Sequence, residues 1–203
     1  MVALLLIWQN FANFMRAVPP VAEEWGARLA LHPNDPLVPS LGRVAQIFRS
    51  WDSFRRVLET FPGNFLGLDF CQGTWAEMED VDLLAAIRYF ARRGKALYLH
   101  FRNVGRSVPS FVGTFVGADQ VGMLAALRVY RECSFPGFFA DDHVPEVAEG
   151  SERGHRSRAL AAGYVRALLA AIMRGRASGH FLAGRTEQAA QTTAIRGPYR
   201  LPK

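Results

Sequence analysis

Cysteine and lysine are both scarce in this chain, whose 203 residues include two cysteines, Cys71 and Cys133, and two lysines. Two cysteines are too few for the disulfide framework of a small secreted domain, so we expect a reducing, cytoplasmic setting. The positive charge therefore comes almost entirely from arginine, and the formal net charge is +6. These arginines are scattered and do not alternate with aromatic residues, as a groove for single-stranded nucleic acid requires. We expect no nucleic-acid partner.

Long hydrophobic runs are missing as well. No stretch approaches the roughly 18–20 apolar residues that span a bilayer, so no membrane partner is expected. The opening segment Met1–Ile7 is apolar but short. It lacks the basic leader and the small-residue cleavage site of a signal peptide. We expect it to form a buried piece of helix or strand.

Half of the residues are hydrophobic, which is enough to bury a core. Short apolar runs alternate with stretches of helical periodicity. Strands are expected at 27–31, 65–70, 96–99 and 137–140, and helices at 11–25, 43–48, 51–60, 80–93, 122–132 and 157–174. This alternation favours an α/β protein with a parallel sheet. No glycine-rich dinucleotide or phosphate motif follows a strand, so a dinucleotide-binding fold is not favoured. Two architectures stay open: a doubly wound sheet and part of a (β/α)8 barrel.

Each expected strand is followed by a potential metal ligand: His32, Cys71, His100 and Asp142. In a (β/α)8 barrel the carboxyl ends of the strands face one mouth, so these side chains would meet there. Two imidazoles, a thiolate and a carboxylate suit a divalent transition metal. Taken singly, each residue could instead have an ordinary structural role: a histidine hydrogen-bonded in a loop, a small buried cysteine or an aspartate in a turn. The recurrence at four strand ends favours the metal site.

Several segments resemble the mannonate dehydratase family, in the order in which that family has them. They are Ala22–Pro36, Leu66–Gly73, His100–Asn103, Asp142–Pro145 and Gly163–Leu169. The resemblance implies a xylose-isomerase-like (β/α)8 TIM barrel. Residues 1–175 would form its C-terminal half, about four of eight βα units, and residues 176–203 an irregular tail.

The same resemblance implies a hydro-lyase that dehydrates D-mannonate to 2-keto-3-deoxy-D-gluconate in hexuronate catabolism, with Mn²⁺ or Fe²⁺ as cofactor. The implied metal ligands are His32, Cys71, His100 and Asp142, and the implied catalytic residues are His143 and Asp142. An imidazole with a pKa near neutrality can carry the proton that the dehydration moves.

Other polar residues near these motifs are candidates for supporting roles. A guanidinium can clamp a carboxylate through two hydrogen bonds, so Arg102 is a candidate for substrate binding, and an ordinary salt bridge is the alternative. Asn103 is expected to position a substrate hydroxyl. Asn34 and Asp35 are expected to orient His32.

The chain departs from the family pattern at two positions and in its length. Gly113 stands where an acidic residue is expected, and Asp141 stands where a proline is expected before Asp142. Half a barrel also leaves two open sheet edges, which a missing N-terminal half or a second copy would pair. Two alternatives to the lyase therefore stay open: an inactive remnant that binds metal or a partner chain, and a related sugar isomerase or epimerase.

Overall fold

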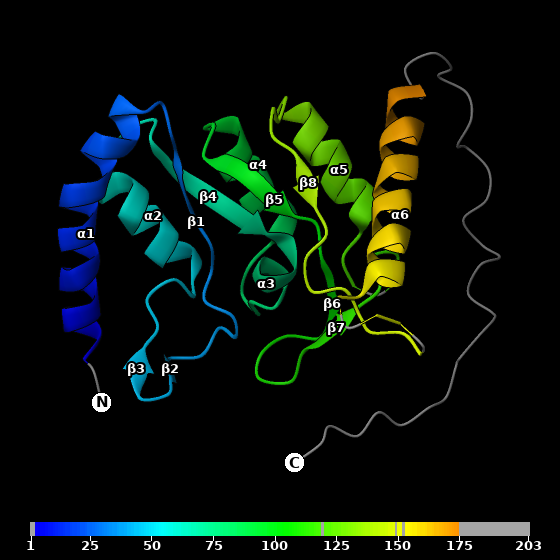
Figure 1. Cartoon of the computed structure of the whole chain (residues 1–203), viewed down its shortest axis with the longest axis horizontal. Coiled ribbons are helices and arrows are strands. Elements are labelled where there is room, and N and C mark those ends of the chain that lie inside the picture. The colour runs from blue at the N-terminus through cyan, green and yellow to red at the C-terminus, as the bar shows by residue number, and fades with distance from the viewer. Residues whose placement is uncertain (1–2, 119, 149, 152, 175–203) are drawn as a thin grey trace.

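A parallel sheet of four strands, in the order β1-β4-β5-β8, forms the centre of the molecule (Figure 1). The computed structural model describes residues 3–118, 120–148, 150–151 and 153–174. The strands are β1 (Leu29–Leu31), β4 (Leu66–Cys71), β5 (Ala96–His100) and β8 (Phe139–Ala140). All three neighbouring pairs are parallel. The predicted α/β fold with parallel βα units is confirmed, whereas the predicted tail, 176–203, lies outside the described residues.

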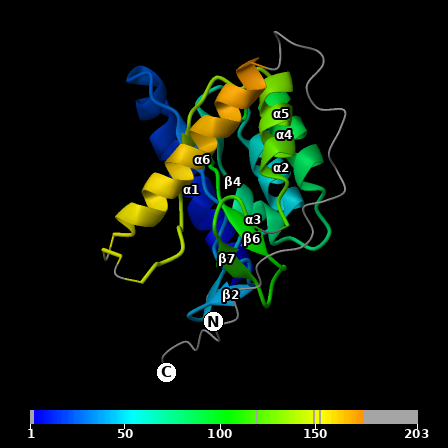
Figure 2. The same ribbon diagram turned by 90° about the vertical axis from the view of Figure 1, so that its right-hand side faces the viewer.

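Helices precede, connect and follow the strands, and some of them cover one side of the sheet (Figure 1). They are α1 (Leu4–Glu24), α2 (Trp51–Thr60), α3 (Gln72–Ala76), α4 (Leu83–Arg92), α5 (Met123–Glu132) and α6 (His155–Arg174). Figure 2 shows α2, α4 and α5 together on the same side of the strands. Within the described residues, no helix combines the length and apolar character needed to cross a bilayer.

The core follows from side-chain alternation along β4. Leu68 and Phe70 point to the helical side and are fully buried there with Trp75 of α3. The Trp75 ring stacks on Phe70, with centroids 4.9 Å apart and planes 7° apart, and it also contacts Phe90 of α4. Because the intervening residues of β4 point to the opposite face, Asp69 and Cys71 project away from this core.

Two small hairpins extend from the carboxyl ends of β1 and β5. They are β2 (Ser40–Leu41) with β3 (Val44–Ala45), and β6 (Asn103–Gly105) with β7 (Val112–Thr114). Both lie along the lower side of the view in Figure 1. They therefore mark the end of the sheet at which the strands finish.

Two local predictions are wrong. The helix expected over 43–48 is replaced by β3, because Gly42 and Arg43 adopt φ values of 54° and 68°, which reverse the chain and cannot open a right-handed helix. The opening segment is helical, but Leu4, Leu5 and Leu6 are exposed and not buried. Helix α3 and both hairpins are too short to produce a periodic signal in the sequence.

The sheet face opposite the helices is partly uncovered. In the part of the chain that the structure describes, β1 and β8 each pair with one strand only. Phe138, beside β8, is 66% exposed, and its ring lies 4.6 Å from that of Tyr98 on β5. This arrangement is that of a segment of a barrel. Within the described residues, the face that would line the barrel is partly uncovered, and both edge strands have one unpaired side.

Candidate metal centre

Four side chains from four strand ends converge at the carboxyl end of the sheet. Each of His32, Cys71, His100 and Asp142 offers one ligand atom, and these atoms all lie within 4.8 Å of one another. His32 follows β1, Cys71 and His100 end β4 and β5, and Asp142 lies two residues beyond β8. The structure therefore brings together all four residues that the sequence pattern singled out.

Strand register explains this convergence. Cys71 pairs with His100 across β4 and β5, so their side chains share the face opposite the helical core. Nδ1 of His100 lies 3.3 Å from Oδ2 of Asp142. The rings of His32 and His100 lie 5.1 Å apart. Because parallel strands end at the same edge, residues from opposite ends of the sequence meet there.

The electrostatics of the cluster favour a thiolate at Cys71. Burial alone raises the pKa of a thiol, but hydrogen bonds to His100 and His32 outweigh it and bring the pKa of Cys71 down to about 6. Thr74 adds a further hydrogen bond, since its hydroxyl donates to the Cys71 sulfur at 3.1 Å. A thiolate is the form of cysteine that ligates metal.

The two charged neighbours shift in opposite directions. Burial lowers the pKa of His100, but hydrogen bonds to Asp142 and Cys71 raise it to about 10. Burial raises the pKa of Asp142, but His100 and His143 stabilise the carboxylate and hold its pKa well below the usual range. Both anionic donors, the Cys71 sulfur and the Asp142 carboxylate, are therefore ready to receive a cation.

The donor set fits one divalent cation. Ligands held by a single ion at about 2.0–2.3 Å lie at most about 4.6 Å from one another, and the observed spread of 4.8 Å is close to that limit. Nδ1 of His100 and Oδ2 of Asp142 are buried and face each other at 3.3 Å. Nδ1 of His32 pairs with the Pro33 carbonyl at 2.6 Å. A carbonyl only accepts, so this nitrogen carries the proton and the other ring nitrogen is free to ligate.

One neighbour of the cluster was missed by the sequence analysis. Oδ2 of Asp69 lies 3.3 Å from Nε2 of His100. This carboxylate is placed to fix the orientation of the imidazole, as partners of metal-ligating histidines do. The sequence could have indicated this residue. Asp69 precedes Cys71 by two residues on the same strand, so the two side chains must lie on the same face of the sheet.

The residues expected to orient His32 have other partners. Oδ1 of Asn34 accepts a hydrogen bond from the Phe48 amide. Asp35 accepts a hydrogen bond from Nη1 of Arg102 at 2.8 Å. These contacts fix the loop after β1. The His32 imidazole instead pairs with the Pro33 carbonyl through Nδ1.

Arg102 and Asn103, the expected substrate-binding residues, are both buried. Arg102 is 6% exposed, pairs with Asp35, and has Nη2 at 3.6 Å from Oε1 of Glu77. Asn103 is 1% exposed, its amide donates to the carbonyls of Val116 and Ala118, and its oxygen accepts from the Val121 amide. The Asn103 side chain thus binds the loop that carries Val116, Ala118 and Val121. Its expected role in positioning a substrate hydroxyl stays a prediction.

Replacing Asn103 by alanine should lower the free energy of unfolding by about 1–3 kcal/mol, because buried carbonyl and amide groups lose their partners. Urea unfolding measures this change, and hydrogen exchange at the Val121 amide should accelerate. The exposed Asn10→Ala is the matched control. Equal stability of the two variants would show that the Asn103 hydrogen bonds contribute nothing.

Asp142 and His143, the expected catalytic residues, are adjacent but differ in exposure. His143 has a positive φ of 49° and a side chain that is 56% exposed. Its Nδ1 contacts the Asp142 carboxylate. Asp141, in contrast, turns away and accepts a hydrogen bond from Arg158 of α6 at 2.9 Å. The extra carboxylate therefore does not join the ligand group.

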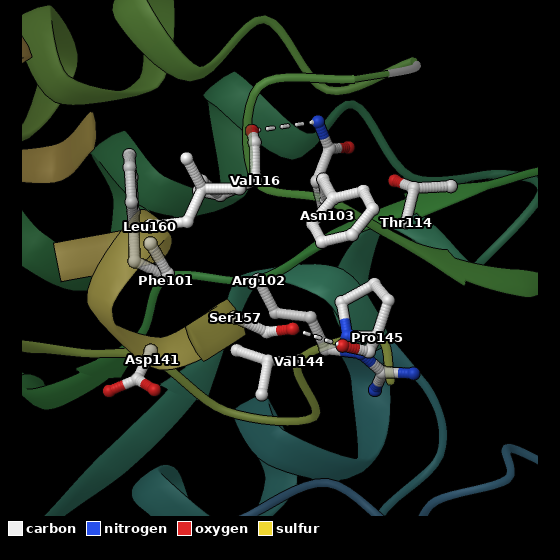
Figure 3. Close-up of a pocket in the computed structure, with 12 residues that line it drawn as sticks. Phe101, Arg102, Asn103, Thr114, Val116, Asp141, Val144, Pro145, Ser157 and Leu160 are labelled. Carbon is white, nitrogen blue, oxygen red and sulfur yellow. Dashed lines mark hydrogen bonds between the residues drawn. The ribbon is translucent and has the colours of Figure 1, made fainter. Parts of the chain in front are cut away.

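A small pocket lies between β6 and the start of α6 (Figure 3). Its lining includes Arg102, Asn103, Asp141 and Ser157, whose hydroxyl donates to the Pro145 carbonyl. The free space is about 10 Å³, which is room for about one water molecule. A ligand larger than a water molecule does not fit into this pocket.

The fold and the four converging donors define a barrel-type α/β protein with a group able to hold a metal ion. The chain belongs to the D-mannonate dehydratase family: the family model described as D-mannonate dehydratase (UxuA) matches residues 2–178.

Relatives of known sequence or structure carry the same name. Mannonate dehydratase 2 of Halalkalibacterium halodurans is 30% identical over 172 residues, which cover 82% of this chain and 50% of that protein. The Streptococcus suis enzyme is 28% identical over 174 residues, covering 83% and 47%. The crystal structure of mannonate dehydratase from Streptococcus suis serotype 2 superposes with a TM-score of 0.80 at 26% identity, covering 86% of this chain and 52% of that one. This chain spans about half the length of these relatives.

Proposed function

We propose that this chain is the metal-binding half of a hydro-lyase that dehydrates D-mannonate to 2-keto-3-deoxy-D-gluconate in hexuronate catabolism. The observation that carries the proposal is the convergence of four ligand atoms within 4.8 Å at the carboxyl end of a parallel sheet. Membership of the D-mannonate dehydratase family supports the choice of substrate.

The metal would be held by His32, Cys71, His100 and Asp142, and Mn²⁺ or Fe²⁺ is the proposed cofactor. When bound, a divalent cation there stabilises negative charge on oxygen atoms of the substrate. Asp69 orients His100 through the 3.3 Å contact to Nε2. Thr74 holds the Cys71 sulfur in place.

The remaining chemistry belongs to side chains at the mouth. Dehydration removes a proton from the carbon beside the carboxylate and hydroxide from the next carbon. His143 is proposed to move the proton, because its ring is partly exposed and Asp142 contacts only Nδ1, which leaves Nε2 accessible. Arg102 is proposed to attract and orient the substrate carboxylate. Asp142 serves twice, as metal ligand and as the group that orients His143.

A direct assay tests this function. The purified chain is loaded with Mn²⁺, incubated with D-mannonate and analysed for 2-keto-3-deoxy-D-gluconate. Product formation by the wild type that is lost in His143→Ala supports the proposal. His155→Ala, a change at an exposed histidine, is the control and should form product like the wild type. Well-folded, metal-loaded protein that forms no product would falsify the enzymatic activity of this chain.

Cys71→Ser should weaken binding of a thiophilic ion such as Zn²⁺ by at least the roughly tenfold that loss of an outer-shell partner costs. A hard hydroxyl replaces a soft thiolate, so Mn²⁺ affinity should fall less than Zn²⁺ affinity. Calorimetric titration measures both. Cys133→Ser, the same change at the other cysteine, should alter neither. Unchanged Zn²⁺ affinity in Cys71→Ser would remove Cys71 from the ligand set.

The open edges of β1 and β8 suggest the partner. We propose that a further set of βα units, from an N-terminal half or from a second copy, pairs with both edges and completes the substrate site. If no such set of βα units pairs with the edges, the second candidate function is favoured: an inactive remnant that binds metal or a partner chain. Chromatography coupled to light scattering, with and without an added N-terminal half, separates these arrangements.

A further inference from the structure

Three ionisable side chains, Asp35, Glu77 and Arg102, form a second, largely buried cluster. Asp35 follows His32 by three residues, Glu77 follows Cys71 by six, and Arg102 follows His100 by two. Each cluster residue therefore comes from a segment that also carries one proposed metal ligand. No motif in the sequence marks Glu77 as a functional residue.

Glu77 is the unusual member of this cluster. Its side chain is 0% exposed, and neither of its carboxyl oxygens makes a hydrogen bond. Oε1 lies 3.6 Å from Nη2 of Arg102, which is beyond hydrogen-bond distance. Asp35, in contrast, accepts a 2.8 Å hydrogen bond from Nη1. The guanidinium is thus anchored through Nη1, and Nη2 is left without a close partner.

Two glycines shape the space around this guanidinium. A Cβ at Gly73 would lie 2.8 Å from Cδ of Arg102, so only glycine lets the arginine stem pass α3. A Cβ at Gly113 would meet Nη2 alone, at 3.9 Å. Nη2 therefore has Glu77 on one side and room beside Gly113 on the other. A carboxylate approaching from the Gly113 side would find a charged donor.

The charge of Glu77 decides whether such an approach is favourable. Two ionised carboxylates against one guanidinium leave the cluster with a net charge of −1, which repels an anion. Burial and the charge of Asp35 raise the pKa of Glu77 to about 8, Arg102 opposes them, and Cys71 adds to the rise. Below that pH the carboxyl is neutral and the cluster has no net charge.

We propose that Glu77 is a positioning residue that controls the availability of Arg102 to a substrate carboxylate. Protonated Glu77 leaves Nη2 free for a carboxylate that enters beside Gly113. Ionised Glu77 pairs with Nη2, so this nitrogen is no longer available to the substrate carboxylate. This inference rests on the proposed function, in which Arg102 orients the substrate carboxylate.

Calorimetry of D-mannonate binding to the Mn²⁺-loaded chain at pH 7 and pH 9 tests the proposal. The wild-type Kd should rise about tenfold over this interval, because a group with a pKa of about 8 goes from mostly protonated to mostly ionised. Glu77→Gln carries no titrating proton, so its Kd should stay flat. Glu79→Gln makes the same change at an exposed position and should keep the wild-type slope. A purely structural role for Glu77 would leave the slope unchanged in Glu77→Gln, and that result would overturn the proposal.

A second probe separates this inference from the proposed function. If D-mannonate does not bind the wild type at either pH, the substrate assignment fails. Acetate, the simplest carboxylate, is then titrated while the NMR signal of the Arg102 Nε–H group is followed. A shift at pH 7 that weakens at pH 9 in the wild type, but not in Glu77→Gln, supports the role of Glu77. The absence of any shift at pH 7 overturns it.

Discussion

Replacing His100 by alanine is expected to lower the affinity for Mn²⁺ by more than about a hundredfold, above the range that loss of an outer-shell partner produces. The reason is its central position. Nδ1 faces Asp142 at 3.3 Å and Nε2 faces Asp69 at the same distance. Alanine removes one ligand and leaves the two carboxylates without the imidazole that separates them.

The experiment is a calorimetric Mn²⁺ titration of His100→Ala beside His155→Ala. His155 is an exposed histidine at the start of α6, where it contacts Ser151. The control should bind Mn²⁺ like the wild type, and circular dichroism should show that both variants are folded. Equal Mn²⁺ affinities in the two variants would place the metal elsewhere and would contradict the proposed centre.

Trp75→Ala should lower the free energy of unfolding by about 3–5 kcal/mol, the cost of truncating a large buried aromatic residue. The Trp75 ring is fully buried between β4 and the helices, where Phe70, Phe54 and Phe90 surround it. A domain of this size is stable by roughly 5–15 kcal/mol in total, so the variant should lose a large part of its stability.

Urea unfolding measures this loss, and Trp25→Ala is the matched control. Trp25 lies just beyond α1 and is 79% exposed, so its replacement should change stability by less than about 0.5 kcal/mol. If both variants unfold at the same urea concentration, the stacked aromatic group around Trp75 does not hold α3 against β4.

Much of the fold was predictable because its elements are long or repeat a simple rule. Helices α2, α4 and α5 were found by their apolar periodicity, and α4 ends where predicted because Gly94 adopts a φ of 64°. The ligand group was predictable for a different reason: parallel strands end at one edge, so one polar residue after each strand is enough to indicate a site.

The parts that were not predictable depend on contacts distant in sequence. Glu77 stands just after a short helix, where a glutamate is ordinarily exposed, and its complete burial becomes visible only when Arg102 and Asp35 are placed beside it. Asn103 likewise reads as a polar residue after a strand, and only the 116–121 loop shows what it binds. Local pattern carries no information on such pairs.

The spread of the four donors along the chain has a consequence for how this molecule acquires its fold. His32 and Asp142 lie at the two ends of the described sheet, so the complete quartet exists only after β1, β4, β5 and β8 have all assembled. Contacts between such distant segments form late and slowly, because the intervening chain must first be ordered. An ion bound at the proposed centre would shift the conformational equilibrium toward the native state. A metal titration during refolding would therefore report the final assembly step.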